Sequence, residues 1–263
     1  MAELYADGMT APASPLPVVR KISPADVAMA LRAGWADFLM IPTQLVFLCI
    51  LYPIVGLVAA RAATDESILP LLFPLLAGLS LLGPVLAVGI YELSRRREEG
   101  LPVTWLNAFD VLRSPSLLGI AAIGMLLFAV FIAWIVAAKL ILFATLGTDT
   151  FASVDAFQQE VLGTSAGWRL IVIGNLVGLA FAILVLTLTA VSVPLLLDRA
   201  ISPVVAVQTS IRVVRTNPVA MGLWGLVVAV SLLLGCIPLL IGLAVAMPVL
   251  GHATWHLYRR VVG

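Results

Sequence analysis

Charge is scarce in this sequence. Only 11% of the 263 residues are charged and the net charge is +1. A nucleic-acid-binding protein needs a basic surface, so that class of partner is not expected. The two cysteines, Cys49 and Cys236, both lie in apolar runs and show neither the CxxC nor the zinc-ligand spacing. We therefore expect no disulfide and no cysteine metal site.

Signatures of catalysis are missing as well. The sequence contains no P-loop, dinucleotide-binding fingerprint, nucleophile elbow or zincin motif. We therefore expect no enzymatic activity and no cofactor. Residues 1–22 lack the basic stretch followed by an apolar stretch that marks a cleavable signal peptide. This segment is predicted to be a disordered cytoplasmic tail.

Hydrophobic residues are present in excess, at 62% of the chain, against roughly 45–50% in soluble proteins. This composition predicts an all-α membrane protein, in which each span needs about 20 apolar residues. Four apolar runs meet that length: Phe38–Ala60, Ile68–Tyr91, Leu117–Leu142 and Leu170–Leu197.

The last apolar run, Val219–Leu257, is 39 residues long and carries no Asp, Glu, Lys or Arg. As one helix it would extend about 58 Å, nearly twice the thickness of the hydrocarbon core. It is therefore predicted to fold into a hairpin that turns at Gly235–Pro238. Six transmembrane helices follow.

Positive charges predict the orientation of these spans. With both termini in the cytoplasm, twelve of the fifteen Lys and Arg residues lie on the cytoplasmic side, as the positive-inside rule requires. A five-span arrangement would place Arg259 and Arg260 outside and weaken this asymmetry. The Arg95–Arg97 loop is interpreted as a determinant of topology that is also suited to contact anionic lipid.

Two similar segments suggest an internal repeat. GPVLAVGIYELSRR (83–96) and MPVLGHATWHLYRR (247–260) are identical at six of fourteen positions. Prolines at 24, 102 and 203 each open a stretch of mixed polarity, predicted to be an interfacial helix, or elbow, that precedes a span. The unit of elbow, outward span and returning span occurs at about 23–97, 102–199 and 203–260.

Three such elbow-plus-hairpin repeats predict pseudo-three-fold symmetry about the membrane normal within a single six-span domain, residues 23–260. The returning spans carry Pro84, Pro194 and Pro248. Proline kinks at one depth would open a cytoplasm-facing vestibule between the repeats. The alternative is that these prolines only end helices near the membrane surface.

The chain's two histidines, His252 and His256, are four residues apart and share one helix face. Superposing the repeats sets Glu92 opposite His256 and Asp198 level with His252. These four residues are the candidate metal site, because ionisable groups at membrane depth point to function and two imidazoles with a carboxylate bind divalent ions. Proton relay and haem ligation are further possibilities. The competing interpretation is that these four residues lie at the cytoplasmic membrane surface and contact water and lipid headgroups. Asn175, between Gly174 and Gly178, is interpreted as part of a helix-packing seam.

The order of these features resembles the bacterial integral-membrane proteins of domain-of-unknown-function family 2189. The stretches that carry the resemblance are Ala33–Phe38, Gly83–Glu92, Pro203–Pro218 and His252–Tyr258, and it would extend over residues 20–260. It implies a bacterial inner-membrane protein without established activity. Some relatives carry labels that suggest a link to terminal oxidases, which implies a respiratory partner.

The sequence thus favours a non-enzymatic accessory or scaffold protein that contacts lipid and another integral membrane protein within the bilayer. The alternative is a small permease with a vestibule between the repeats. A carrier needs polar residues near the middle of the membrane, and this chain offers only Asn175, Thr187 and Thr189, all in one span.

Overall fold

Helices account for the regular structure of the protein. The structure, a computed structural model, describes residues 16–41, 69–147, 151, 153–237 and 241–263. Within these ranges one isolated antiparallel bridge, between Val19 and Val262, is the sole β feature. The all-α prediction is confirmed. The elements are α1 (Pro24–Met40), η1 (Leu69–Leu71), α3 (Leu72–Leu81), α4 (Gly83–Leu86), α5 (Val88–Glu98), η2 (Trp105–Arg113), α6 (Leu117–Leu146), α7 (Val154–Gly163), α8 (Ser165–Thr189), α9 (Ser192–Asp198), α10 (Pro203–Thr216), α11 (Pro218–Cys236) and α12 (Leu243–Val261).

Three helical segments in the described part of the chain are long and apolar enough to cross a membrane. They are Leu117–Leu146, Ser165–Asp198 and Pro218–Cys236. The first two coincide with predicted spans, and the third is the first arm of the predicted hairpin. The membrane class expected from composition is thereby supported by helices of sufficient length.

The predicted span Ile68–Tyr91 is interrupted rather than continuous. Its helix breaks at Leu82 and again at Ala87, on either side of Pro84. Proline has no N–H to donate and its ring crowds the preceding turn, so a break at this point is expected. The predicted span Phe38–Ala60 lies outside the described residues beyond residue 41, where α1 has just ended.

The chain turns back within 219–257 as predicted, but of the two arms only α11 is among the described helices that are long and apolar enough to span a membrane. α11 ends at Cys236 and α12 begins at Leu243, with residues 238–240 outside the described part of the chain. A Cβ atom added to Gly235 would lie 2.8 Å from Cδ2 of Leu243. Only glycine allows the two helices to approach so closely where the chain turns back.

Two of the three elbow helices start where local chemistry predicts. Ser23 and Ser202 precede the helices that begin at Pro24 and Pro203, as serine N-caps followed by proline should. The second elbow was predicted to open at Pro102, which is wrong. Thr104 forms a capping box with Asn107 instead, so the 3-10 helix η2 begins at Trp105.

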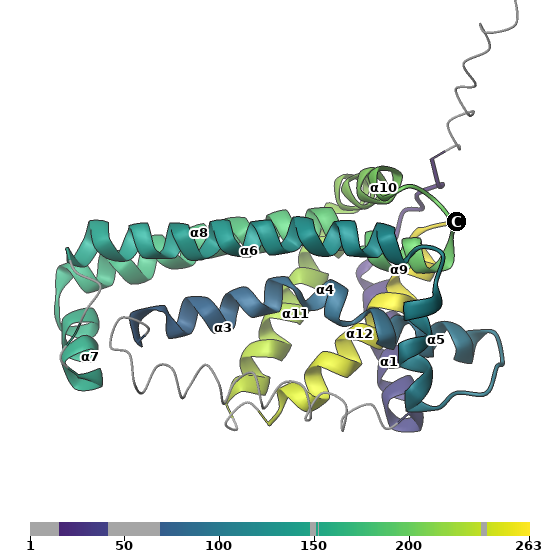
Figure 1. Cartoon of the computed structure of the whole chain (residues 1–263), viewed down its shortest axis with the longest axis horizontal. Coiled ribbons are helices and arrows are strands. Elements are labelled where there is room, and N and C mark those ends of the chain that lie inside the picture. The colour runs from purple at the N-terminus through teal and green to yellow at the C-terminus, as the bar shows by residue number, and fades with distance from the viewer. Residues whose placement is uncertain (1–15, 42–68, 148–150, 152, 238–240) are drawn as a thin grey trace, which may run out of the picture.

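The helices divide into an elongated arm and a packed end. The helices α6 and α8 lie side by side along the longest axis (Figure 1) and form the arm. The packed end is built around α12, which α1 and α5 contact. α12 buries 12 of its 19 residues, whereas α8 buries 3 of 25. The core therefore surrounds α12, and α8 exposes most of its apolar surface.

The repeat prolines differ in local structure. Pro248 lies inside the continuous helix α12, whereas Pro194 follows a break at 190–191 and Pro84 sits between two breaks. The pseudo-three-fold arrangement of six spans is not confirmed by these elements.

Residues 16–22 form a strap against the carboxyl-terminal residues. The amide of Arg20 donates to the carbonyl of Val261 at 2.8 Å, and the amide of Gly263 donates to the carbonyl of Val18 at 2.9 Å. The predicted tail reached residue 22, so its last seven residues are held by the fold. The strap brings the described start of the chain next to residue 263.

Candidate functional site

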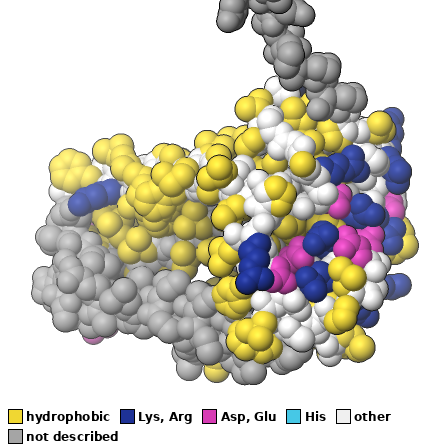
Figure 2. All heavy atoms as spheres, turned by 45° about the vertical axis from the view of Figure 1, so that its right-hand side comes forward, with side chains coloured by type: hydrophobic (Ala, Val, Ile, Leu, Met, Phe, Trp, Pro, Cys, Tyr) yellow, Lys and Arg dark blue, Asp and Glu magenta, His cyan; other side chains and the backbone are white. Residues whose placement is uncertain are grey.

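Charged side chains gather at the packed end of the molecule (Figure 2). Figure 2 shows Lys, Arg, Asp and Glu interleaved there, while hydrophobic side chains cover much of the arm on the same face. The candidate site lies in this region, at the contact of α1, α5 and α12.

Asp37 of α1 is the centre of the site. Its side chain is 6% exposed, and it accepts hydrogen bonds from Ser94 Oγ at 2.7 Å and His256 Nε2 at 2.8 Å. Arg97 of α5 completes the shell with an ion pair to the other carboxylate oxygen. Burial alone would raise the pKa of Asp37. The hydrogen bonds from His256 and Ser94 outweigh it and hold the pKa below its usual value of 3.8.

The hydrogen-bond pattern fixes the tautomer of His252. Ser94 Oγ lies 2.7 Å from His252 Nδ1 and 2.7 Å from Asp37 Oδ2. Because the hydroxyl has a single proton and the carboxylate only accepts, that proton points to Asp37. His252 Nδ1 must then carry a hydrogen and donate to Ser94. Its Nε2 is left as a buried acceptor without a partner among the described residues.

Small residues allow the helices to approach closely enough for these contacts. A Cβ atom on Gly34 would lie 2.7 Å from Cα of Ala253. The two helices run in opposite directions, as the pairs Asp26–Arg260 and Gly34–Ala253 show. The side chains of Asp37 and His256 each tilt toward the start of their own helix and so toward each other, and the close approach at Gly34 lets them meet. A Cβ on Gly251 would similarly meet Ile90 of α5 at 3.0 Å.

The four residues of the predicted metal site do not come together. The two histidines do share a face, but their carboxylate is Asp37. Glu92 is paired with Arg95 at 2.8 Å and with Arg96 at 3.9 Å. Over the ranges that the structure describes, no group of three or more His, Cys, Asp or Glu side chains is arranged to hold a metal ion. Metal binding therefore stays a prediction, without support from the positions of Glu92 and Asp198.

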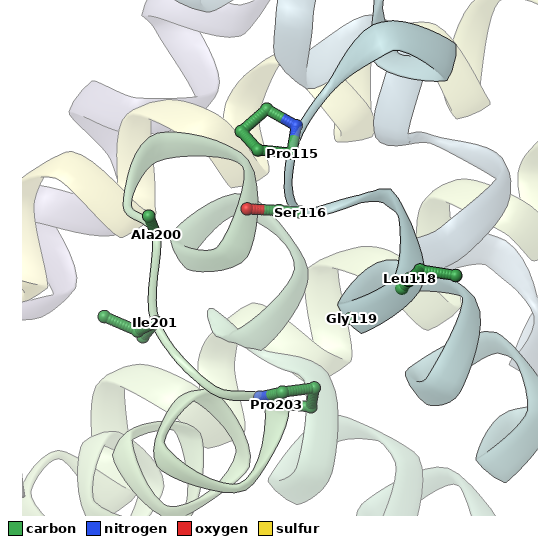
Figure 3. A pocket seen from close by; sticks show the side chains of 7 residues that line it. All are labelled: Pro115, Ser116, Leu118, Gly119, Ala200, Ile201 and Pro203. Atoms are coloured by element: carbon green, nitrogen blue, oxygen red, sulfur yellow. The ribbon is translucent and has the colours of Figure 1, made fainter. Parts of the chain in front are cut away.

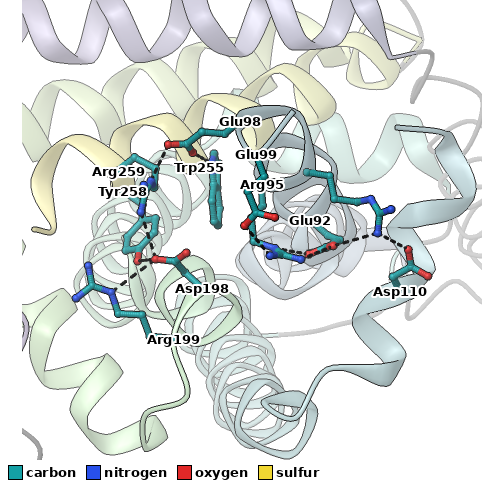
Figure 4. A network of polar contacts seen from close by, with 11 residues as sticks. Glu92, Arg95, Glu98, Glu99, Asp110, Asp198, Arg199, Trp255, Tyr258 and Arg259 are labelled. Atoms are coloured by element: carbon teal, nitrogen blue, oxygen red, sulfur yellow. Dashed lines mark hydrogen bonds and ion pairs between the residues drawn. The ribbon is translucent and has the colours of Figure 1, made fainter. Parts of the chain in front are cut away.

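Asp198 belongs to a second polar network, drawn in Figure 4. It accepts a hydrogen bond from the Tyr258 hydroxyl and lies 3.4 Å from Arg259 Nη1. Arg259 in turn binds Glu98 at 2.9 Å, and Glu98 also accepts from Trp255 Nε1 at 2.8 Å. These contacts tie α9, α5 and α12 together, so Asp198 and Glu98 anchor helices to one another.

Sequence reasoning missed Asp37, Ser94 and Arg97. One signal was available: Asp37 is an isolated acid in the apolar stretch Gly34–Met40, at the edge of a predicted span. An acid in that position needs a partner. Ser94 gives no such signal, because a serine next to an arginine-rich loop has nothing unusual about it.

A pocket of about 350 Å³ opens elsewhere, between the first turn of α6 and the connection from α9 to α10 (Figure 3). None of its lining residues is ionisable, and Ser116 contributes the one side-chain hydroxyl. The pocket therefore has no acid or base that could activate the Ser116 hydroxyl for catalysis. The lining residues are Pro115, Ser116, Leu118, Gly119, Ala200, Ile201 and Pro203.

Comparison with known families bears on the central part of the chain. Residues 72–198, which run from α3 to the end of α9, match the model described as "Predicted integral membrane protein (DUF2189)". These residues, just under half of the chain, are similar to that family. The resemblance expected from the sequence is confirmed over these residues. No curated protein and no solved structure matches the chain.

The DUF2189 match contains only part of the candidate site. Ser94 and Arg97 lie inside residues 72–198, whereas Asp37, His252 and His256 lie outside. In the candidate site, the helix α5 of the matched region therefore meets α1 and α12 from the two flanking segments. The family description gives membrane class and no activity.

Proposed function

We propose that this protein is a non-enzymatic accessory or scaffold protein of a bacterial inner membrane that works by lateral contact with another integral membrane protein. Six spans with both termini in the cytoplasm are part of this proposal, and a respiratory complex is the first partner to test. The support comes from the exposed face of α8.

The observation that carries the proposal is an amide on the outward face of a span. Asn175 is exposed on α8, and its side-chain nitrogen donates to the carbonyl of Ile171 at 2.8 Å. The large side chains on the same face, Trp168 and Leu179, are each 56% exposed. Lipid tails offer an amide no hydrogen bond, whereas a neighbouring helix does. An exposed asparagine in a span therefore favours a protein neighbour.

Small residues beside Asn175 are consistent with such a neighbour. Gly178 packs against α6, because a Cβ there would lie 3.2 Å from Trp134 of that helix. A Cβ on Gly174 would meet nothing within 4 Å. The predicted packing seam is thus occupied on one side by α6 and open on the other, where a second backbone could approach.

The permease alternative has less support. The polar side chains of the α8 span do not converge on a cavity. Thr187 donates to the carbonyl of Ile183, and Thr189 donates to that of Val185, both at 2.7 Å. Each hydroxyl has donated its one proton within its own helix, whereas the Asn175 amide keeps a second N–H and its oxygen for another partner.

Site-specific photo-crosslinking tests the proposal in native membranes. A photoreactive residue replaces Leu179 on the proposed contact face. The matched control replaces Leu118, an equally apolar and 84% exposed residue at the start of α6. We expect Leu179 to give one discrete protein adduct that Asn175→Leu removes, and Leu118 to give lipid adducts. Lipid adducts alone at Leu179, or an adduct that Asn175→Leu leaves unchanged, would contradict lateral protein contact.

A further inference from the structure

Acidic side chains at the packed end are fully engaged by one set of arginines. Every acid described in this region has a basic partner within 4.0 Å, so none remains to neutralise further positive charge. The acids are Asp26, Asp37, Glu92, Glu98, Glu99, Asp110 and Asp198, and their partners are Arg95, Arg96, Arg97, Arg199, Arg259 and Arg260.

Arg95, Arg96 and Arg97 were predicted to form a loop suited to anionic lipid, but they lie in the last turn of α5, and their charges are neutralised by these acids. A second set of basic residues is not. Arg20, Lys21, Arg212 and Arg215 form no ion pair with any described acid. Arg20, Lys21 and Arg215 are exposed and Arg212 is half-buried.

The strap brings Arg20 and Lys21 close to the end of α10, which carries Arg212 and Arg215. Asn217, which follows α10, accepts from the amide of Ile22 at 2.8 Å and donates to the carbonyl of Arg20 at 3.1 Å. Arg212 donates to the carbonyl of Pro17 at 3.4 Å. Residues 17–22 are thus fixed against the last turns of α10. We call Arg20, Lys21, Arg212 and Arg215 the strap cluster.

The strap cluster lies where a candidate membrane span begins. Asn217 is also the residue that precedes α11, so the strap is bonded to the first turn of that span. An exposed apolar stripe starts there and follows one face of α11, because its members are spaced by seven, four and three residues. The stripe consists of Val219, Leu226, Val230 and Leu233, with exposures of 73%, 59%, 44% and 67%.

We propose that the strap cluster and the α11 stripe together bind an anionic phospholipid. The guanidinium groups of the strap cluster take the phosphate, and the acyl chains lie along the stripe. Arginine is suited to phosphate because its planar donors match the phosphate oxygens. A soluble polyanion such as a nucleic acid would use the charges but gain nothing from the stripe. This proposal concerns α10 and α11, so it does not depend on protein contact at α8.

Lipid titration of the full-length protein in detergent tests the proposal. Binding of phosphatidylglycerol is measured by native mass spectrometry, with phosphatidylcholine, inorganic phosphate and a short oligonucleotide as comparison ligands. The test variant is Arg212→Gln/Arg215→Gln. The matched control, Arg32→Gln/Arg113→Gln, removes two equally unpaired charges from α1 and η2. Should the double variant fold poorly, Arg215→Gln alone changes one exposed side chain.

We expect the test variant to lose affinity for phosphatidylglycerol by roughly fivefold per charge removed, and the control to keep the parent affinity. Phosphatidylcholine binding should be the same in all three proteins. Equal losses in test and control variants would overturn the proposal, since the net charge would then explain binding. Displacement of phosphatidylglycerol by an equal concentration of inorganic phosphate or oligonucleotide would overturn the choice of a lipid.

Discussion

Replacing Asp37 tests the candidate site most severely. Asp37→Ala removes the acceptor of Ser94, which is fully buried, and of His256, whose side chain is 22% exposed. Leaving the buried Ser94 hydroxyl without its acceptor costs about 1–3 kcal/mol, and leaving the partly exposed His256 without its acceptor costs about 1 kcal/mol. Arg97 is 37% exposed, so water can hydrate its guanidinium group in the variant, and the loss of this ion pair adds little to the destabilisation. We expect a total of about 2–4 kcal/mol, and roughly half of that for Asp37→Asn, which keeps one acceptor oxygen.

Thermal unfolding in a mild detergent, followed by tryptophan fluorescence, measures this loss. The matched control is Glu99→Ala, since Glu99 also pairs with an arginine at 2.8 Å but its side chain is 45% exposed. A surface ion pair of that kind contributes at most about 1 kcal/mol. If Asp37→Ala were no more destabilising than Glu99→Ala, the interpretation of Asp37 as the centre of the packed end would be refuted.

The same site predicts a pH dependence. The folded protein holds the pKa of Asp37 below 3.8, so the ionised carboxylate contributes stability at pH values above 3.8. That contribution is lost as the pH falls through the lowered pKa. The unfolding midpoint of the parent protein should therefore fall more steeply in this acid range than that of Asp37→Asn. Parallel curves would contradict the ionised state assigned to Asp37.

Two further predictions concern the same helix contacts. Ser94→Ala removes the acceptor of His252 Nδ1, and leaving that buried group unsatisfied should lower the free energy of unfolding by about 1–3 kcal/mol. Gly34→Ala sets a methyl group against the backbone of Ala253, which should cost about 1–3 kcal/mol as overpacking. Gly174→Ala, where a Cβ meets nothing, should be neutral in the same thermal assay, and a comparable loss there would argue against steric specificity at Gly34.

Local signals in the sequence predicted the starts and turns of helices well. Ser23 and Ser202 cap helices at the expected prolines because the capping chemistry involves only neighbouring residues. The hairpin around Gly235 followed from length alone, since 39 uncharged residues exceed one membrane crossing. The start of the second elbow was predicted at the wrong residue, because the capping box of Thr104 and Asn107 begins the helix after Pro102 rather than at it.

The partners of the histidines could not be predicted in the same way. The spacing of His252 and His256 correctly placed both on one face. Their carboxylate was chosen by superposing repeats, which says nothing about how α1 packs. That packing depends on the fit of Gly34 against Ala253, a contact between residues 219 positions apart. A fit of this kind is a property of the folded chain rather than of any local pattern.

The proposal that this protein spans the membrane six times is tested most directly by measuring on which side of the membrane its loops and its carboxyl-terminal residue lie. We propose that α6, α8 and α11 are three of the six spans and that the strap and residue 263 lie together on the cytoplasmic side. A reporter fused after Gly263 and another inserted within 147–168 should report opposite sides, with the first in the cytoplasm. Reporters on the same side, or an extracytoplasmic signal at Gly263, would contradict it.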